Sequence, residues 1–422
     1  MGRKPWWQRD EAADVEAAAD LSDDQLRELA EGLKAVNKAE GEPRQTSPGD
    51  QGPPNGEASP GEESSEPSPD ALVPWGPGGP PPLEKWVPDV LGDKFEVRVS
   101  ALQPDEEGGV LTSLVRRVIK GRRAKRAVKF AFLYIHGRND YFFHEELAED
   151  LAGIGAAFYA LDLRKYGRSL RPWQTIGYAD DLTVYDEDLA VAVATIRNDH
   201  PDLPLVVYGH STGGLIATLW AWRNPGIADA LVLNSAWLEL QSLTTMRPAL
   251  HQVVSRLAAV RPRATVVGQS KINGYYRSIA EGWAQSGFPL PDSLVGYEDD
   301  PAVTGWNVHP EWKLPFSYPA PAAWMQAVLE GHAQIEKQVH LECPVLSMMS
   351  SSSHNEEQWT PDYFSSDVVL NADILAQRSA HLSNNVTIVR FPGKHDLMLS
   401  DPEVRQDVYA TIERWLKFIQ IL

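Results

Sequence analysis

A candidate nucleophile stands in the segment Gly209-His210-Ser211-Thr212-Gly213, which has the G-x-S-x-G pattern. The apolar run Leu205–Tyr208 comes before it, and the helical pattern Thr212–Arg223 comes after it. Glycines at 209 and 213 let the backbone turn sharply from strand to helix, which lifts the hydroxyl above the sheet. The turn also points the first amides of the helix at this hydroxyl. The sequence therefore predicts Ser211 as a nucleophile, with Gly209 and Gly213 shaping its turn.

A serine hydroxyl is a weak nucleophile at neutral pH and needs a neighbouring base. His395 lies in Pro392-Gly393-Lys394-His395-Asp396, between the last predicted strand, Val386–Phe391, and the predicted closing helix, Pro402–Phe418. It follows the serine in the chain, in the order Ser, acid, His that accompanies this motif. We therefore predict that His395 takes the proton of Ser211.

The acid that orients the histidine is harder to assign. It should follow the predicted strand Val345–Met349, but a run of four serines comes first. Asp367 lies further along the chain, 28 residues before His395, and is the preferred candidate. Asp362 and Glu357 remain as alternatives.

A second loop supplies candidates for stabilising negative charge. His136-Gly137-Arg138-Asn139 follows the apolar strand Ala127–Ile135. In acyl transfer, backbone N–H groups stabilise the charge that develops on the carbonyl oxygen. One N–H is expected from this loop, and the other from the residue after the nucleophile. The sequence thus predicts an oxyanion hole made by Arg138 and Thr212, and a structural role for the side chain of His136.

Strands alternate with helices over most of the chain. Further segments are predicted as strands at 94–101, 110–118, 156–161 and 229–233, and as a helix at 179–196. Such alternation predicts a mostly parallel sheet with helices on both faces. Between about 236 and 340 the alternation stops, and a segment of that length is not a simple loop. We expect it to form a cap over the carboxyl ends of the strands.

The chain has 422 residues and a formal net charge of −19, which argues against nucleic acid as a partner. Residues 1–70 hold 7 Lys and Arg against 17 Asp and Glu, and residues 41–82 hold 12 Pro. A segment of this composition cannot bury enough apolar area to offset its ordering entropy. We therefore expect residues 1–84 to be an acidic, Pro-rich, mostly disordered region, and residues 85–422 to form the catalytic domain.

The single cysteine, Cys343, excludes an intramolecular disulfide and suits a reducing compartment. The N-terminus has no apolar signal-peptide region, and no run of 18 apolar residues occurs. We expect a cytoplasmic protein without integral membrane association. H-E-x-x-H, P-loop and dinucleotide-binding patterns are not found in the sequence. Neither a metal site nor a cofactor is predicted.

Three segments together resemble a known family. HGRNDYFFHEELAEDLAGIGAAFYALDLRKYGRSL, GHSTGG and PGKHDLMLS are similar to motifs of the monoacylglycerol-lipase and serine-aminopeptidase-like (S33-type) branch of the α/β-hydrolases. The resemblance covers about residues 88–422 and implies the α/β-hydrolase fold, with a helical cap inserted after the sixth core strand. In that family the oxyanion donor follows HG, which is Arg138 here, and the acid heads a D-x-V-V-like turn, which is Asp367 here. Where relatives have DLRGHGRS, this chain has DLRKYGRS at 162–169.

These residues predict a serine hydrolase that cleaves carboxylic esters through an acyl-enzyme intermediate. Aromatic residues of the expected cap favour a small-molecule ester with a lipid-like acyl chain; they are Trp237, Tyr275, Tyr276, Trp283, Trp306, Trp312 and Trp324. One alternative is a serine aminopeptidase or amidase with the same triad, which would need an acidic anchor for the substrate amine. A non-catalytic binding protein is a second alternative, disfavoured by the intact Ser, His and acid.

Overall fold

The computed structural model describes residues 83–422 except 241–246, 268–272, 317 and 355–357. Most of the predicted disordered region, 1–82, lies outside the described residues, so its disorder stays a prediction. In the part of the chain that is described, no helix has both the length and the apolar character needed to cross a bilayer.

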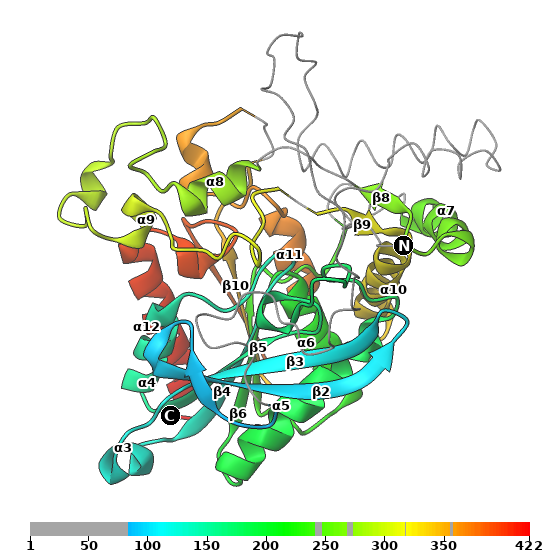
Figure 1. Cartoon of the computed structure of the whole chain (residues 1–422). Coiled ribbons are helices and arrows are strands. Elements are labelled where there is room, and N and C mark those ends of the chain that lie inside the picture. Colours follow the sequence, from blue (N-terminus) through cyan, green and yellow to red (C-terminus); the bar gives the residue numbers. More distant parts are fainter. Residues whose placement is uncertain (1–82, 241–246, 268–272, 317, 355–357) are drawn as a thin grey trace, which may run out of the picture.

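A nine-stranded sheet lies at the centre of the described part, in the order β1-β2-β3-β5-β4-β6-β7-β10-β11 (Figure 1). The strands are β1 (Val87–Asp89), β2 (Gly92–Asp105), β3 (Gly108–Arg117), β4 (Phe130–Ile135), β5 (Ala156–Asp162), β6 (Leu205–His210), β7 (Ala230–Asn234), β10 (Val345–Ser350) and β11 (Val386–Phe391). Neighbouring strands are antiparallel from β1 to β5 in this order. From β5 to β11 every neighbouring pair is parallel. The prediction of a mostly parallel sheet is confirmed.

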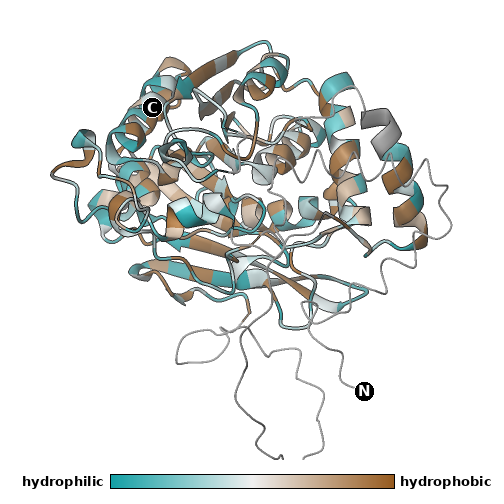
Figure 2. Cartoon of the chain, turned by 90° about the horizontal axis from the view of Figure 1, so that it is seen from above, coloured by the Kyte–Doolittle hydropathy of each residue, from teal (hydrophilic) through white to brown (hydrophobic). Residues whose placement is uncertain are grey.

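Alternate side chains of the central strand β4 enter two different cores. Phe130, Phe132 and Tyr134 pack with α4 (Glu145–Gly153) and α12 (Pro402–Phe418). Ala131, Leu133 and Ile135 pack on the other face, where the covering helices are α5 (Tyr185–Asp199), α6 (Thr212–Arg223) and α10 (Ala322–Lys337). Because both faces are covered, the strand is a continuous apolar run in the sequence. Figure 2 shows brown, hydrophobic segments on the strands, together with teal segments on strands at the outside of the sheet.

Two predicted boundaries are wrong. The helix expected from residue 179 begins at Tyr185, after the 3-10 turn η4 (Leu182–Val184). Asp181 starts that turn, because its side chain accepts a hydrogen bond from the N–H of Thr183 at 2.8 Å. The strand expected from residue 127 begins at Phe130, because the short helix α3 (Arg122–Arg126) precedes it.

The insertion between β7 and β10 contributes elements on two sides of the upper part of the molecule (Figure 1). On one side lie α7 (Arg247–Val260), β8 (Thr265–Val267), β9 (Ala320–Pro321) and α10; on the other lie α8 (Gly274–Ala280) and α9 (Pro301–Thr304). Helix α10 shares the main core with α6, so the C-terminal part of the insertion also covers the sheet.

Candidate active site

Ser211 occupies the tight turn between β6 and α6. Its φ is 52° and its ψ is −120°, a backbone conformation that costs energy for a residue with a side chain. A Cβ on Gly209 would lie 2.6 Å from the carbonyl oxygen of Gly213, and a Cβ on Gly213 would lie 2.2 Å from that of His136. Only glycine fits at these two positions, as the motif predicts.

The structure brings Asp367 and His395 together. Asp367 Oδ2 lies 2.8 Å from His395 Nδ1, and both side chains are buried. The other oxygen, Asp367 Oδ1, accepts hydrogen bonds from the N–H groups of Val369 (2.9 Å) and Leu370 (2.7 Å). The alternative acid Asp362 instead faces His354 at 3.8 Å, with 57% of its side chain exposed. The other alternative, Glu357, lies outside the described residues.

The loop after β4 lies against the serine. A Cβ added to Gly137 would stand 3.1 Å from Ser211 Cβ, so the absence of a side chain permits this approach. Arg138 follows in this loop, and Thr212 is the first residue of α6. Within the described residues, the N–H groups of Arg138 and Thr212 donate to no acceptor. The backbone therefore offers two free N–H donors next to the serine, one from Arg138 and one from Thr212.

The family model described as serine aminopeptidase, S33, matches residues 126–352, which is more than half of the chain. The chain belongs to the serine aminopeptidase S33 family. Its central sheet and flanking helices are those of an α/β-hydrolase, and it is a hydrolase.

Relatives of this S33 hydrolase include a monoglyceride lipase homolog of Monkeypox virus, 24% identical over 65% of this chain and 83% of the relative. A monoacylglycerol lipase of Mycolicibacterium smegmatis is 33% identical over 27% of this chain and 40% of the relative. A solved structure of a monoglyceride lipase from Saccharomyces cerevisiae superposes with a TM-score of 0.52 at 15% identity, covering 81% of this chain and 97% of that chain. The structural similarity supports the fold alone.

His136 holds two loops of the S33 fold together. Its Nε2 accepts a hydrogen bond from the N–H of Leu163 at 3.1 Å, and its Nδ1 lies 2.7 Å from the carbonyl oxygen of Gly137. These partners require a neutral imidazole with the proton on Nδ1. Burial lowers the pKa of His136, which favours this neutral form although Asp162 and Asp140 oppose the shift. The structural role predicted for this side chain agrees with these contacts.

Insertion residues hold the loop that carries Arg138. The side chain of Asn139 donates to the carbonyl oxygen of Leu314 and accepts from its N–H, both at 2.9 Å. Arg138 Nη2 donates to the carbonyl oxygen of Tyr318 at 2.6 Å, and its guanidinium lies 4.5 Å from the centre of the Tyr318 ring. The ring of Trp324 stands at 4.6 Å from the same group. The insertion therefore fixes the backbone next to Ser211.

The loop that carries His395 is held from α8. Lys394 Nζ donates to the carbonyl oxygen of Ser278 at 2.9 Å. The Tyr275 hydroxyl accepts from the N–H of Asp396 at 3.2 Å, and its ring lies edge-on to that of His395, with 5.6 Å between centroids. Contacts on both neighbours of His395 thus restrict its imidazole.

Several aromatic residues of the insertion between β7 and β10 are buried against other parts of the chain. Trp306 and Trp312 belong to a buried cluster with Tyr141 and Leu399, and Trp283 stacks on Phe364 with 4.1 Å between ring centroids. These three tryptophans stabilise the fold and do not indicate an acyl pocket. Trp237 and Tyr275 remain beside the site, since the backbone N–H of Trp237 donates to the carbonyl oxygen of Ser211 and the ring of Tyr275 contacts that of His395.

The loop DLRKYGRS at 162–169, which departs from the relatives at Lys165 and Tyr166, forms buried ion pairs. Arg168 Nε lies 2.7 Å from Asp89 Oδ2, and Arg168 Nη1 lies 2.8 Å from Asp162 Oδ2, with all three side chains fully buried. Lys165 pairs with Glu107 at 2.7 Å. These residues join β1 and the β2–β3 hairpin to the loop after β5.

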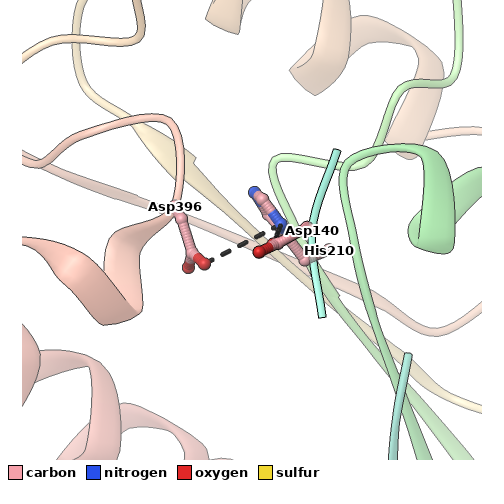
Figure 3. Close-up of side chains that lie close together, drawn as sticks. All are labelled: Asp140, His210 and Asp396. Atoms are coloured by element: carbon pink, nitrogen blue, oxygen red, sulfur yellow. Dashed lines mark ion pairs between the residues drawn. The ribbon is translucent and has the colours of Figure 1, made fainter. Parts of the chain in front are cut away.

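Sequence reasoning missed a buried polar cluster behind the serine. Asp140, His210 and Asp396 bring their polar atoms within 4.8 Å of one another (Figure 3). Each stands within two residues of a predicted site residue, but this closeness is visible only once the three loops are folded. The adjacency of His210 to Ser211 and of Asp396 to His395 is the one sequence signal that could have indicated it.

Proposed function

We propose that this S33 hydrolase cleaves carboxylic esters with a lipid-like acyl chain, using Ser211 as nucleophile, His395 as general base and Asp367 as orienting acid. The observation that carries the proposal is the 2.8 Å contact between Asp367 and His395, which joins residues 28 positions apart. The strained elbow conformation of Ser211 supports it further.

The proposed reaction follows from the hydrogen bonds of His395. Its contact with Asp367 keeps a proton on Nδ1, so Nε2 has a lone pair for the Ser211 hydroxyl. The serine oxygen attacks the ester carbonyl, and the N–H groups of Arg138 and Thr212 stabilise the oxyanion. His395 then gives its proton to the leaving alcohol, and an acyl-serine forms. A water molecule, deprotonated by His395, releases the carboxylic acid and restores the serine.

An ester is favoured over a peptide with a free amine because the acids of the insertion that are not exposed are paired with arginines. Asp300 pairs with Arg405, Glu281 pairs with Arg277, and Glu239 pairs with Arg378. The six further acids of the insertion are exposed; they are Asp292, Glu298, Asp299, Glu311, Glu330 and Glu336. Among the described acids of the insertion, these contacts leave no buried carboxylate to anchor a substrate amine. Relatives named as monoglyceride lipases support the same choice.

Residues 236–340 are proposed to act as the cap of a catalytic domain that spans residues 85–422. The contacts of Arg138 with Tyr318 and of Lys394 with Ser278 support this role, because both join insertion residues to the loops beside Ser211. In this arrangement the cap covers the site and also holds its parts in position.

The test compares p-nitrophenyl esters of increasing chain length with a monoacylglycerol and an aminoacyl amide. Medium or long acyl esters and the monoacylglycerol should be turned over, while the aminoacyl amide should be a poor substrate. A higher kcat/KM for the amide would instead identify an aminopeptidase. Labelling of Ser211 by a fluorophosphonate separates both enzymes from a binding protein, which would remain unlabelled.

A further inference from the structure

The buried cluster behind Ser211 joins three separate loops. His210 Nδ1 lies 3.5 Å from Asp140 Oδ2 and 3.8 Å from Asp396 Oδ2. Figure 3 shows the imidazole with the two carboxylates directed towards it. Asp140 belongs to the loop that carries Arg138, His210 ends β6, and Asp396 follows His395. All three residues are at most 3% exposed.

One oxygen of each carboxylate has a partner other than His210. Asp140 Oδ1 pairs with Lys313 Nζ at 2.8 Å. Asp396 Oδ1 accepts from Asn234 Nδ2 at 2.7 Å and from the N–H of Met398 at 3.0 Å. Among the described residues, the two remaining Oδ2 atoms have no hydrogen-bond partner of good geometry. His210 is the group that both of them face, so the charge on His210 decides whether they are stabilised.

The charges of the cluster balance only when His210 is protonated. Asp140 and Asp396 bring two negative charges, and Lys313 supplies one positive charge. An uncompensated charge in a buried site is strongly destabilising. Burial alone would lower the pKa of His210, but Asp396 and Asp140 outweigh it and raise the pKa. Lys313 and His210 in turn hold the pKa of Asp140 below its usual range, despite burial.

Lys394 is another buried cation near Asp396, but its Nζ donates to the carbonyl oxygen of Ser278, and Asp401 is its main opposite charge. The remaining titratable groups around the cluster do not supply the missing charge. They are His395 on the base loop, His144 before α4, Tyr134 on β4, Tyr208 on β6 and Tyr275 on α8. Burial lowers the pKa of His144, which keeps it neutral, and raises the pKa of all three tyrosines. The ring centroid of His395 lies 5.0 Å from that of His210, and the partner of His395 Nδ1 is Asp367.

We propose that His210 is a positioning residue that is protonated at neutral pH, an imidazolium that holds the Arg138 loop and the His395 loop in place beside Ser211. Its effect on turnover rests on the function proposed above. The charge state itself does not, because it concerns the folded protein whatever the substrate. Through Asp140 it fixes one proposed oxyanion donor, and through Asp396 it fixes the proposed base.

The pH dependence has a definite sign. A histidine whose pKa is higher in the folded than in the unfolded state stabilises the fold fully below its unfolded pKa, about 6.5. That contribution is lost as the pH rises through the folded pKa. We therefore expect a histidine-dependent loss of melting temperature and kcat on the alkaline side of neutrality.

The test uses a charge-balance cycle in the full chain: His210→Asn, Asp396→Asn and the double variant. His210→Asn leaves one negative charge uncompensated and should lower kcat by roughly tenfold, the size of coupling found between contacting charged groups. The double variant restores the balance and should be more active and more stable than His210→Asn alone. A purely packing role predicts the opposite, since two substitutions would damage the site more than one. Asp396→Asn alone should move the alkaline limb of the pH profile to lower pH.

NMR titration of the imidazole signal that His210→Asn removes measures the charge directly. A protonated His210 at pH 7.5 is expected; a signal that titrates at its ordinary pKa, or stays neutral, would overturn the proposal. A loss of activity on dialysis against EDTA would also overturn it, because a metal ion would then neutralise the carboxylates. If Ser211→Ala were active, the proposed function would fail, while the NMR and melting measurements would still decide the state of His210.

Discussion

Asp367 Oδ2 lies 2.8 Å from His395 Nδ1, and the backbone fixes the opposite oxygen of the same carboxylate through two N–H groups. The carboxylate is fully buried, so water does not compete for either oxygen. An acid held in this way selects one tautomer and one orientation of the imidazole.

Asp367→Asn should lower kcat by roughly 10⁴-fold, because the amide can donate to Nδ1 and select the wrong tautomer. The oxygen of the asparagine can keep the bonds from Val369 and Leu370, so the fold should survive. Steady-state ester hydrolysis and a melting curve check both expectations. Asp362→Asn is the matched control and should be close to wild type. The reverse pattern would mean that Asp367 is not the orienting acid.

Ser211→Ala should abolish ester hydrolysis and fluorophosphonate labelling while leaving the melting temperature nearly unchanged. The hydroxyl is the proposed nucleophile, so its loss should stop the reaction. Alanine has the same Cβ as serine, which the elbow already accommodates at φ 52°, so the fold should not change. Residual turnover above about a hundredth of wild type would exclude Ser211 as the nucleophile, because loss of a triad member costs far more.

The elbow, the mostly parallel sheet and the preference for Asp367 could be predicted from the sequence. The elbow and the strands follow local patterns, and the chain order Ser, acid, His indicates an acid between the serine and the histidine. Gly209 and Gly213, four positions apart, indicate the tight turn around Ser211. Parallel strands that are buried on both faces can be predicted because they are continuous apolar runs in the sequence. The position of the acid after a strand narrowed the choice, although the sequence alone left three candidates open.

The remaining features depend on contacts between distant segments. Arg168 reaches Asp89, 79 residues earlier, and that contact ties the DLRKYGRS loop to β1 without any local signal in the sequence. Lys313 reaches Asp140, 173 residues earlier. A long-range ion pair has no periodicity in the sequence, so only the folded chain reveals it.

Arg168→Lys should destabilise the protein by about 1–3 kcal/mol, the usual cost of leaving buried hydrogen-bond acceptors without a donor. The guanidinium bonds Asp89 through two nitrogens, at 2.7 and 2.8 Å, and reaches Asp162 and the carbonyl oxygen of Phe142 through a third. A lysine ammonium is a single point and cannot span these acceptors. Denaturant unfolding measures the change. Arg98→Lys, at an exposed pair with Glu84, is the control and should have almost no effect.

Deleting residues 1–84 should leave kcat and the melting temperature nearly unchanged, because the sequence predicts disorder there and β1 begins only at Val87. The deletion removes the exposed ion pair of Glu84 with Arg98, worth about 0–1 kcal/mol. Deletion of residues 1–82 keeps that pair and is the matched comparison. A large drop in melting temperature for both truncations would indicate that the N-terminal region docks on the catalytic domain.

Lys394 should make the free energy of unfolding rise with pH in the alkaline range. Its Nζ is buried, donates to the carbonyl oxygen of Ser278 and lies 5.0 Å from the centre of the Phe364 ring. Burial lowers the pKa of Lys394 to about 8, although Asp401 partly opposes the shift. Between that pH and the unfolded pKa of about 10.4, the unfolded chain binds a proton that the folded chain has released. Stability attributable to this group therefore increases across the window.

Lys394→Met removes this titration while keeping a long apolar side chain over the ring. The difference in unfolding free energy between wild type and variant should grow from pH 8 to pH 10 by up to ~3 kcal/mol, since one pKa unit corresponds to about 1.4 kcal/mol. Lys417→Met, at an exposed lysine paired with Glu413, should give a difference that does not depend on pH. Denaturant melts at four or five pH values measure both variants. A flat profile for Lys394→Met would show that the buried lysine keeps its ordinary pKa, and that the His395 loop carries a full positive charge next to the proposed base.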